Sequence, residues 1–398
     1  MNYTLKSSVA ALALCGLASA AIAEDVKIGI LLGFTGPVES LTPQMGASAE
    51  LAIAEASDSG LFLGGQTISG KRGDSTCIDS SAATASAERL ISSEKIVGLM
   101  GAACSGVTMA VLNNVAVPND LVMISPSATS PALSADTDNG LFFRTAPSDL
   151  RQGELLATVL LDRDVKNVAV SYTNNDYGKG FSDSFVAAYE QAGGAVTLVA
   201  PHEDGKADYT AEASALSVAG GDLLVLLGYA DQGASGIIRA SLDIGGFDQF
   251  AGGDGMHSEI IIKNFGSDLN FFGIVPWSTG DGAERFTAIA EKAAIKADSS
   301  FVREAYDSTA LLILAMQAHG STEGYASSVM DVANAPGELI YPGELAKGLQ
   351  ILADGGDIDY VGGSAVELIG NGESAGTFRE FESRDGAFET LRLLGADD

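Results

Sequence analysis

The sequence predicts an α/β protein of two lobes, each built on a parallel sheet covered by helices. Short continuous apolar runs alternate with segments of helical periodicity, as expected for βαβ units. This alternation begins near the N-terminus, pauses around residue 146 and then starts again. Glycine is frequent, with 48 residues, and proline is sparse, with 10, which favours tight strand–helix turns over an all-β architecture.

The predicted elements of the first lobe follow this pattern in order. Residues 26–32 (VKIGILL) form a continuous apolar run, which is typical of a buried parallel strand. Residues 44–58 place apolar side chains at a spacing near 3.6 and predict a helix. Further helices are predicted at 82–93 and 106–116, and further strands at 96–100 and 121–125. Residues 65–72 (GQTISGKR) nearly match a phosphate-binding loop, but Arg72 replaces the required hydroxyl, so we expect a glycine-rich turn.

The second series begins after residues 144–147, where we expect the chain to cross to the other lobe. Strands are predicted at 167–172, 195–199 and 223–227, and helices at 150–163, 180–192, 208–219 and 231–242. The chain is then expected to return near 274–276 and to form two strong helices at 283–296 and 302–318. The tail from residue 357 alternates apolar and polar residues, which predicts antiparallel edge strands.

Length and charge restrict the class of protein. The 398 residues include 22 Lys and Arg against 52 Asp and Glu, giving a net charge of −30 at pH 7. A field of this sign repels phosphate backbones and anionic lipid, so a nucleic-acid-binding protein is excluded. The hydrophobic share of 46% suits two or three packed domains. Beyond the N-terminus, no apolar run approaches the ~20 residues that span a bilayer.

Residues 1–23 are typical of a signal peptide. Lys6 supplies a positive start, residues 9–17 an apolar core, and residues 21–23 (AIA) the small residues before a cleavage site. We therefore expect cleavage between Ala23 and Glu24 and an exported protein. A buried N-terminal helix is the alternative, and lipidation of Cys15 is a second one.

The cysteines and histidines predict a disulfide but no metal site or catalytic set. Cleavage leaves Cys77 and Cys104, and an even pair in an oxidising compartment is most simply one disulfide, with two buried thiols as the alternative. The three histidines are scattered without zinc-ligand spacing. We therefore expect a protein that is not an enzyme and that uses no cofactor.

Polar residues follow the predicted strands where an open α/β sheet binds its ligands. Ser105 begins a helix after strand 96–100, and Ser127 and Thr129 follow strand 121–125. Hydroxyl groups and helix N-termini there favour an anion such as a carboxylate, although such residues are also ordinary helix caps. In the second series Tyr177 and Tyr229 follow strand ends as candidate site residues, with buried tyrosines as the alternative. Asp254 lies in a glycine-flanked loop, where it is either an ammonium acceptor or a turn-forming residue.

Several of these segments together resemble the substrate-binding proteins of bacterial ABC importers for branched-chain and related amino acids. The resemblance covers nearly all of residues 25–398. It depends on KIGILLGFTGP (27–37), GLMGAACSGVT (98–108), MISPSATSP (123–131), FRTAPSD (143–149), NDYGKG (175–180) and FAGGDG (250–255). It implies two Rossmann-like lobes of the type I periplasmic binding fold, joined by three hinge crossovers. The implied N-terminal lobe comprises 24–146 plus 276–355, and the C-terminal lobe 147–275 plus 356–398.

The resemblance also implies a ligand set and a disulfide between Cys77 and Cys104. The implied ligand contacts are those of Ser105, Ser127, Thr129, Tyr177, Tyr229 and Asp254. Ser105 and Thr129 are expected to hold an α-carboxylate, and Asp254 an α-ammonium. The loop at 38–45 lacks the aromatic residue of many relatives, Asp254 replaces the commoner Glu, and Trp277 is a possible pocket wall.

We therefore expect an extracytoplasmic solute-binding protein that closes around an amino acid and delivers it to an inner-membrane ABC permease. An exported ligand sensor of the same fold and a binder of organic acids or amides are alternatives, and a hydrolase is the weakest. We expect a monomer. The sequence does not determine which ligand binds.

Overall fold

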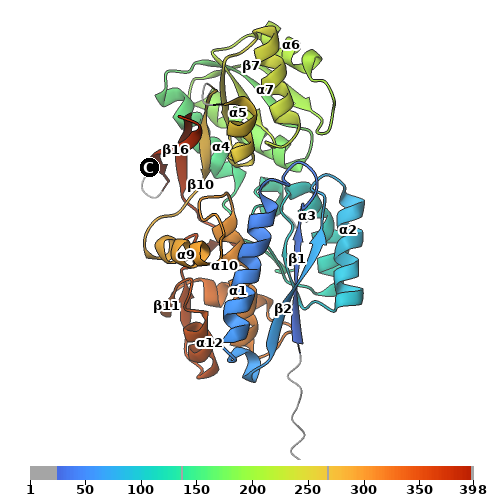
Figure 1. Ribbon diagram of the computed structural model, residues 1–398, viewed down its shortest axis with the longest axis vertical. Coiled ribbons are helices and arrows are strands. Elements are labelled where there is room, and N and C mark those ends of the chain that lie inside the picture. Colours follow the sequence, from blue (N-terminus) through green and yellow to red (C-terminus); the bar gives the residue numbers. More distant parts are fainter. Residues whose placement is uncertain (1–24, 136–137, 267–268, 396–398) are drawn as a thin grey trace, which may run out of the picture.

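The structure, a computed structural model, describes residues 25–135, 138–266 and 269–395. Within these ranges the chain forms two lobes stacked along the long axis of the molecule (Figure 1). The predicted signal peptide and its cleavage site lie outside the described residues. No helix in the described part of the chain is long and apolar enough to cross a membrane.

The first lobe contains a seven-stranded sheet in the order β13-β14-β5-β4-β3-β1-β2. Strands β1 to β5 are parallel, and β13 and β14 form an antiparallel pair at one edge. The strands are β1 (Asp25–Leu32), β2 (Thr67–Asp74), β3 (Gly98–Gly101), β4 (Met123–Ser125), β5 (Phe142–Arg144), β13 (Leu368–Ile369) and β14 (Glu373–Ser374). The helices are α1 (Thr42–Asp58), α2 (Ser80–Arg89), α3 (Ser105–Val111), α9 (Asp281–Lys292), α10 (Val302–His319), α11 (Ala326–Ala333) and α12 (Leu345–Ala353). A small parallel pair, β11 (Glu338–Ile340) and β12 (Ile358–Tyr360), completes this lobe.

The second lobe has the order β16-β15-β10-β9-β8-β6-β7, which repeats the first lobe in its five parallel strands, whereas its edge pair begins with β15 antiparallel to β10. Its strands are β6 (Asn167–Thr173), β7 (Ala195–His202), β8 (Leu223–Leu227), β9 (Gln249–Gly252), β10 (Asn270–Pro276), β15 (Phe378–Arg384) and β16 (Ala387–Leu394). Its helices are α4 (Asp149–Asp162), α5 (Asp176–Gln191), α6 (Thr210–Ala219), α7 (Gly233–Ile244) and α8 (Glu259–Phe265). The predicted α/β fold with largely parallel sheets in two lobes is confirmed.

Two local predictions differ from the structure. Residues 67–74 form the edge strand β2, which pairs with β1 over its whole length, rather than a glycine-rich turn. An edge strand tolerates the glycines and charged residues that hid it in the sequence. Helix α5 begins at Asp176 instead of residue 180, because the Asn175 side chain accepts a hydrogen bond from Gly178 N at 3.0 Å and caps the helix.

The chain crosses between the lobes three times among the described residues, after β5, after β10 and after β14. The predicted boundary between residues 355 and 356 is wrong. β12 pairs with β11, and β14 pairs with β5 in the first sheet, so the chain returns to the second sheet only at β15. Short strands of mixed polarity carry no signal in the sequence that assigns them to one sheet or the other. The second and third crossings are joined by a hydrogen bond from Trp277 N to Thr377 O at 2.8 Å.

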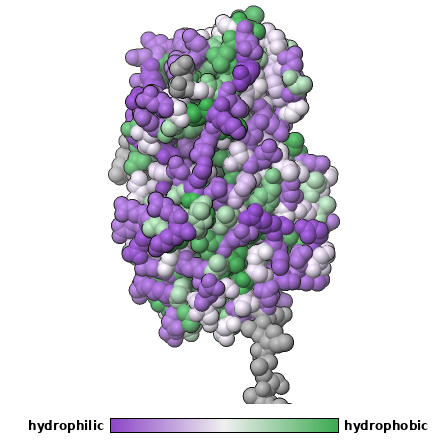
Figure 2. All heavy atoms as spheres, in the orientation of Figure 1, coloured by the Kyte–Doolittle hydropathy of each residue, from purple (hydrophilic) through white to green (hydrophobic). Residues whose placement is uncertain are grey.

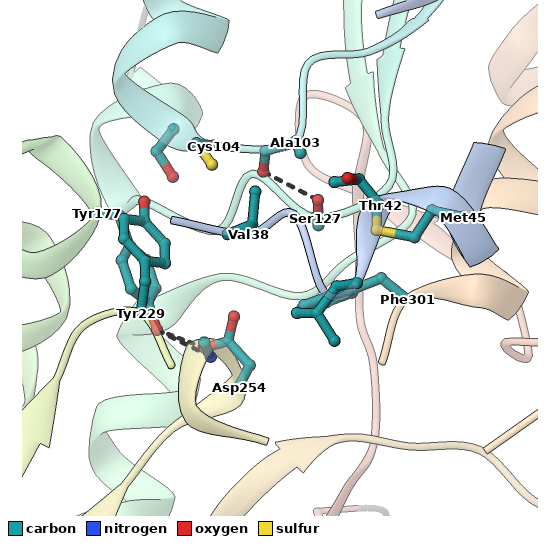
Figure 3. Close-up of a pocket in the computed structure, with 13 residues that line it drawn as sticks. Val38, Thr42, Met45, Ala103, Cys104, Ser127, Tyr177, Tyr229, Asp254 and Phe301 are labelled. Carbon is teal, nitrogen blue, oxygen red and sulfur yellow. Dashed lines mark hydrogen bonds between the residues drawn. The ribbon is translucent and has the colours of Figure 1, made fainter. Parts of the chain in front are cut away.

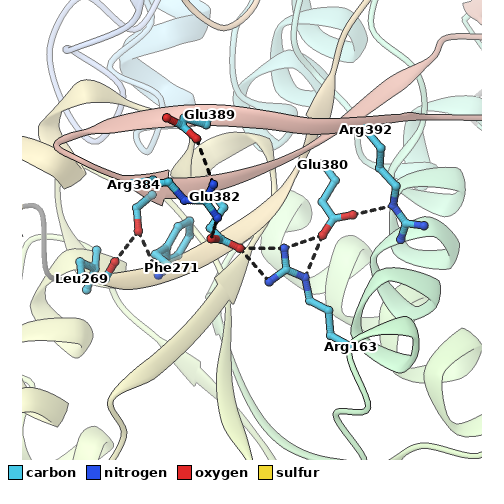
Figure 4. A network of polar contacts seen from close by, with 9 residues as sticks. Arg163, Leu269, Phe271, Glu380, Glu382, Arg384, Glu389 and Arg392 are labelled. Carbon is cyan, nitrogen blue, oxygen red and sulfur yellow. Dashed lines mark hydrogen bonds and ion pairs between the residues drawn. The ribbon is translucent and has the colours of Figure 1, made fainter.

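A charged network fixes the C-terminal hairpin β15–β16 to the second lobe (Figure 4). Glu380 is only 4% exposed and lies between Arg163, at the end of α4, and Arg392 of β16, with N–O distances of 2.6 Å to each. Arg163 also contacts Glu382 at 3.0 Å and lies over the Phe272 ring at 4.0 Å. The last strands of the chain are thus joined to α4, the first helix of this lobe.

Most acidic residues are at least partly exposed, although a few, such as Asp307 and Glu380, are buried. Figure 2 shows hydrophilic side chains over much of this face of both lobes. Exposed lysines form pairs with acidic neighbours, as in Lys179–Asp183 and Lys296–Glu259. Such exposed pairs contribute little to stability, so the surface charge mainly affects solubility and long-range repulsion.

We predict that Glu380→Ala lowers the free energy of unfolding by about 3 kcal/mol, because removing one partner of a buried ion pair costs roughly 3–5 kcal/mol. Urea titration followed by circular dichroism measures this. Glu389→Ala is the matched control on the same hairpin, because its pair with Arg384 is about half exposed, and it should cost less than about 1 kcal/mol. Equal losses in both variants would contradict the prediction.

Candidate ligand-binding site

A narrow cavity lies between the lobes (Figure 3), and the space inside it that a water-sized sphere can reach is about 30 Å³. Five of the six predicted ligand residues line it; the sixth, Thr129, does not. The lining residues are Val38, Leu41, Thr42, Met45, Ala103, Cys104, Ser105, Ser127, Tyr177, Tyr229, Asp254, Gly255 and Phe301. The cavity is therefore formed where strands of both sheets end, as the sequence predicted.

A disulfide fixes the first-lobe side of the cavity. Cys77, which follows β2, is bonded to Cys104, the residue before α3, and their Cα atoms are 5.2 Å apart. The predicted pairing is confirmed. Because Cys104 lines the cavity and precedes Ser105, the bond holds the start of α3 against the turn after β2.

Hydrogen bonds determine which serine hydroxyl has a proton to offer a ligand. The Ser127 hydroxyl donates to Ala103 O at 2.9 Å, so its oxygen can only accept a further hydrogen bond. The Ser105 hydroxyl instead accepts from Ser130 N at 3.1 Å, which leaves its proton free. Ser105 therefore has a proton that it could donate to a carboxylate, and its role at the ligand stays a prediction.

Thr129 has a different partner from the one predicted. Its hydroxyl donates to Asp149 Oδ2 at 2.8 Å, and both side chains are fully buried. In this arrangement the hydroxyl proton of Thr129 is directed at Asp149, and the role of Thr129 at a carboxylate stays a prediction. Asp149, the first residue of α4, was not among the predicted site residues.

The second lobe contributes a buried acidic centre. Asp254 follows β9 and is 3% exposed, and its Oδ1 accepts from the Tyr177 hydroxyl at 2.9 Å. Tyr177 stacks on Tyr229 with ring centroids 5.1 Å apart, so the two predicted tyrosines form one aromatic wall. Burial raises the pKa of Asp254 to about 6, although hydrogen bonds from Tyr177 and Gln152 oppose this rise.

Hydrogen-bond acceptors outnumber donors around Asp254. Burial and the negative charge of Asp254 raise the pKa of Asp149 as well. Asp149 Oδ1 and Gln152 Oε1 are buried and accept no hydrogen bond within the described ranges. None of the cavity-lining residues is Lys, Arg or His. Neither Asp149 nor Gln152 lines the cavity, so the buried carboxylate of Asp254 is the feature that suits this end of the cavity to a cationic group.

The other end of the cavity is apolar. Val38, Leu41 and Met45 come from the loop after β1 and from α1, and Phe301 comes from the residue before α10. Phe301 is 6% exposed and has a φ of 63°, a conformation that is rare for a bulky residue and often marks functional sites. It provides the aromatic side chain that the loop at 38–45 lacks. Sequence reasoning missed Phe301 because nothing in the sequence indicates that it reaches the cavity.

Trp277 does not form a wall of the cavity, contrary to the prediction. Its ring lies between two guanidinium groups, with Arg379 Cζ 3.6 Å and Arg303 Cζ 3.9 Å from the ring centroid. These cation–π contacts orient the indole beside the second crossing and away from the cavity lining.

The structure supports neither a nucleophile nor a metal site. Residues 372–376 (GESAG) match the G-x-S-x-G spacing of hydrolases, a match that sequence reasoning overlooked. Ser374, however, lies in the two-residue strand β14 and not at a strand-to-helix turn. Among the described residues, no group of three or more His, Cys, Asp or Glu side chains is arranged to hold a metal ion.

Comparison with known proteins identifies relatives of the same architecture. The profile of a family described as periplasmic binding protein matches residues 25–335. The Leu/Ile/Val-binding protein homolog 3 of Brucella melitensis is 33% identical over 264 residues, which cover 64% of this chain and 68% of that protein. A leucine-binding protein from Thermotoga maritima superposes with a TM-score of 0.80 at 20% identity, covering 94% and 99% of the two chains. A solute-binding protein from Rhodopseudomonas palustris HaA2 in complex with p-hydroxybenzoic acid has a TM-score of 0.75 at 17% identity, covering 94% and 98%.

We predict that Phe301→Ala changes the relative affinities for large and small apolar ligands. Loss of the ring enlarges the apolar end, and such a change in pocket size is worth roughly 1–3 kcal/mol, or about 10- to 150-fold. Calorimetric titration with L-alanine, L-valine, L-leucine and L-phenylalanine measures the ratios. An unchanged order and spacing of affinities would show that Phe301 does not shape the side-chain end.

Proposed function

The chain belongs to the periplasmic binding protein family, and from this premise we propose that it binds an amino acid with an apolar side chain for an ABC importer. Proteins of this family bind a substrate without converting it, and this chain is accordingly not an enzyme. Its Brucella relative is named as a Leu/Ile/Val-binding protein homolog, which supports an aliphatic amino acid as the ligand class.

The observation that carries the proposal is the buried carboxylate of Asp254 in a cavity without a cationic lining residue. An α-ammonium group supplies both the missing positive charge and three donors for the surrounding acceptors. Asp254 is the lining residue suited to this end of the ligand, with the buried pair of Asp149 and Thr129 outside the cavity lining. The Ser105 proton is suited to the α-carboxylate, and the wall that includes Phe301 is suited to the side chain.

An organic acid is the alternative ligand, since a structural neighbour binds p-hydroxybenzoic acid. A ligand of that kind offers a carboxylate but no ammonium group. The Asp254 carboxylate would then lack a cationic partner inside the closed cavity, or would bind as the neutral acid, and with a pKa of about 6 its protonation at pH 7 costs about 1.4 kcal/mol. The acidic centre therefore favours a zwitterion over an organic acid.

Export and delivery complete the proposal. The features of residues 1–23 support secretion with cleavage between Ala23 and Glu24, and thus a periplasmic location. The partner in this proposal is an inner-membrane ABC permease that receives the amino acid from a monomeric binding protein. Closure of the lobes is favoured by ligand contacts to both of them.

A ligand screen tests the proposed function. Protein freed of ligand by unfolding and refolding is mixed with each amino acid, with p-hydroxybenzoate and with aliphatic amides, and its melting temperature is recorded. We expect L-leucine, L-isoleucine or L-valine to raise the melting temperature most. Stabilisation by p-hydroxybenzoate alone would replace the amino-acid proposal with the organic-acid alternative.

We predict that Asp254→Asn weakens amino-acid binding by tens to thousands of fold. Removing one partner of a buried charge pair costs roughly 2–5 kcal/mol. Ser105→Ala should weaken binding less, by roughly 1.5–3 kcal/mol for one hydrogen bond to a charged group. Titration calorimetry measures both, and Asp254→Glu, which keeps the charge, is the control expected to retain most of the affinity. Wild-type affinity in Asp254→Asn would mean that the ligand carries no ammonium group.

We also predict that binding weakens in acid. Burial in the closed cavity raises the pKa of Asp254 to about 6, and only the ionised carboxylate pairs with an ammonium group. Affinity should be constant from pH 8 to pH 7 and fall about tenfold by pH 5, because one proton must be released on binding. Calorimetry across this range measures the slope, which Asp254→Asn should flatten. Affinity that rises as the pH falls would contradict the prediction.

A further inference from the structure

The ligand cavity is separated from a larger neighbouring cavity by three chain segments. Residues 38–45 and 299–301 come from the first lobe, and residues 254–258 come from the second. Each segment has side chains on both cavities. Leu41 itself lines both, and Asp254 and Phe301 face the ligand cavity while His257 and Ser299 face the neighbouring one. The partition therefore exists only where the two lobes meet.

Two hydrogen bonds join His257 of the second lobe to Ser300 of the first. The Ser300 hydroxyl donates to His257 O at 3.0 Å, and Ser300 Oγ lies 2.8 Å from His257 Nδ1. Because the hydroxyl proton is already used, His257 Nδ1 must be the donor in the second bond. Both residues are buried, His257 at 7% and Ser300 at 4% exposed.

Arg379 keeps His257 in the form that carries its proton on Nδ1. Its Nη2 lies 3.0 Å from His257 Nε2, and since a guanidinium can only donate, Nε2 must be the acceptor. The imidazole is therefore neutral with its proton on Nδ1, and burial and the nearby Arg379 charge lower its pKa to about 3. Arg379 is itself held on the face of Trp277 and by Thr390 Oγ1 at 3.1 Å.

We propose that His257 and Ser300 are positioning residues that stabilise the closed state and so raise ligand affinity without touching the ligand. This inference rests on the proposed function, because it assumes lobes that open and close around a solute. Rotation of the lobes away from each other separates the two residues, so their hydrogen bonds favour the closed state alone. Arg379 and Trp277 keep the imidazole in the tautomer that can donate across the partition.

The first test removes the hydroxyl of Ser300 from its contact with His257. Ser300→Ala should weaken binding of L-leucine about 5- to 100-fold, as expected when buried donors and acceptors lose their partner, and mainly by faster dissociation. Ser299→Ala is the matched control, since its side chain faces the neighbouring cavity and makes no hydrogen bond within the described ranges, and it should bind as the wild type does. Unfolding of the ligand-free protein should be unchanged in Ser300→Ala, whereas a merely structural role would lower its melting temperature.

A second readout is independent of ligand identity. Spin labels at Glu88→Cys and Val218→Cys, exposed positions on different lobes, report the distance between lobes. In the ligand-free protein Ser300→Ala should shift the distance distribution toward longer values than Ser299→Ala. An identical distribution would overturn the inference even if L-leucine binds. If the wild type does not bind L-leucine, the proposed ligand is wrong. The spin-label distances still test whether the His257–Ser300 contact stabilises the closed state.

Nuclear magnetic resonance of the imidazole nitrogens provides the third readout. The chain contains only three histidines, so His257 can be assigned by comparison with His257→Gln. We expect the Nδ1-protonated neutral form, and Arg379→Met should produce a mixture of tautomers. An Nε2-protonated ring in the wild type would overturn the assignment of His257 as donor to Ser300.

Discussion

The binding site depends on one constraint, a carboxylate that is buried without a cation beside it. Asp254 is almost inaccessible to solvent, and the lining of its cavity contains no basic side chain. Hydrogen bonds from Tyr177 and Gln152 offset the unfavourable burial only in part, so the pKa of Asp254 remains above its ordinary value. The aromatic wall, the orphan acceptor Asp149 Oδ1 and the shortage of donors are all understandable if a positively charged group joins this centre.

Much of the fold could be predicted because buried parallel strands and amphipathic helices have strong apolar patterns. Residues 223–227 were predicted as a strand and coincide with β8, which is entirely buried. The strands at the edges of the sheets were harder to predict. Strand β2 has a mixed, half-exposed pattern that resembles a turn, and β12 and β14 are too short to indicate which sheet they join. Their places depend on pairing with strands far away in the sequence, which local patterns do not encode.

The candidate site could be predicted as far as strand ends determine it. Ser105, Ser127, Tyr177, Tyr229 and Asp254 meet at one cavity because parallel strands end at the same edge of each sheet. What the sequence could not give is the direction of individual side chains. The Thr129 hydroxyl donates to Asp149. The Trp277 ring packs against the guanidinium groups of Arg303 and Arg379. Phe301 lines the cavity with a positive backbone φ angle. Each of these outcomes depends on contacts between distant segments.

The five parallel strands have the same order in the two sheets, and this gives the site an internal correspondence. β3 and β8 occupy the same position in their sheets, and they lead to Ser105 and Tyr229 respectively. β4 and β9 also correspond, and they lead to Ser127 and Asp254. Equivalent loops of a repeated fold thus face each other with different chemistry, neutral hydroxyls on one side and a carboxylate on the other. In such a duplicated architecture each half can change separately. A substitution in one loop can therefore alter which ligand charge the cavity favours, while the opposite lobe and the crossings between the lobes stay as they are.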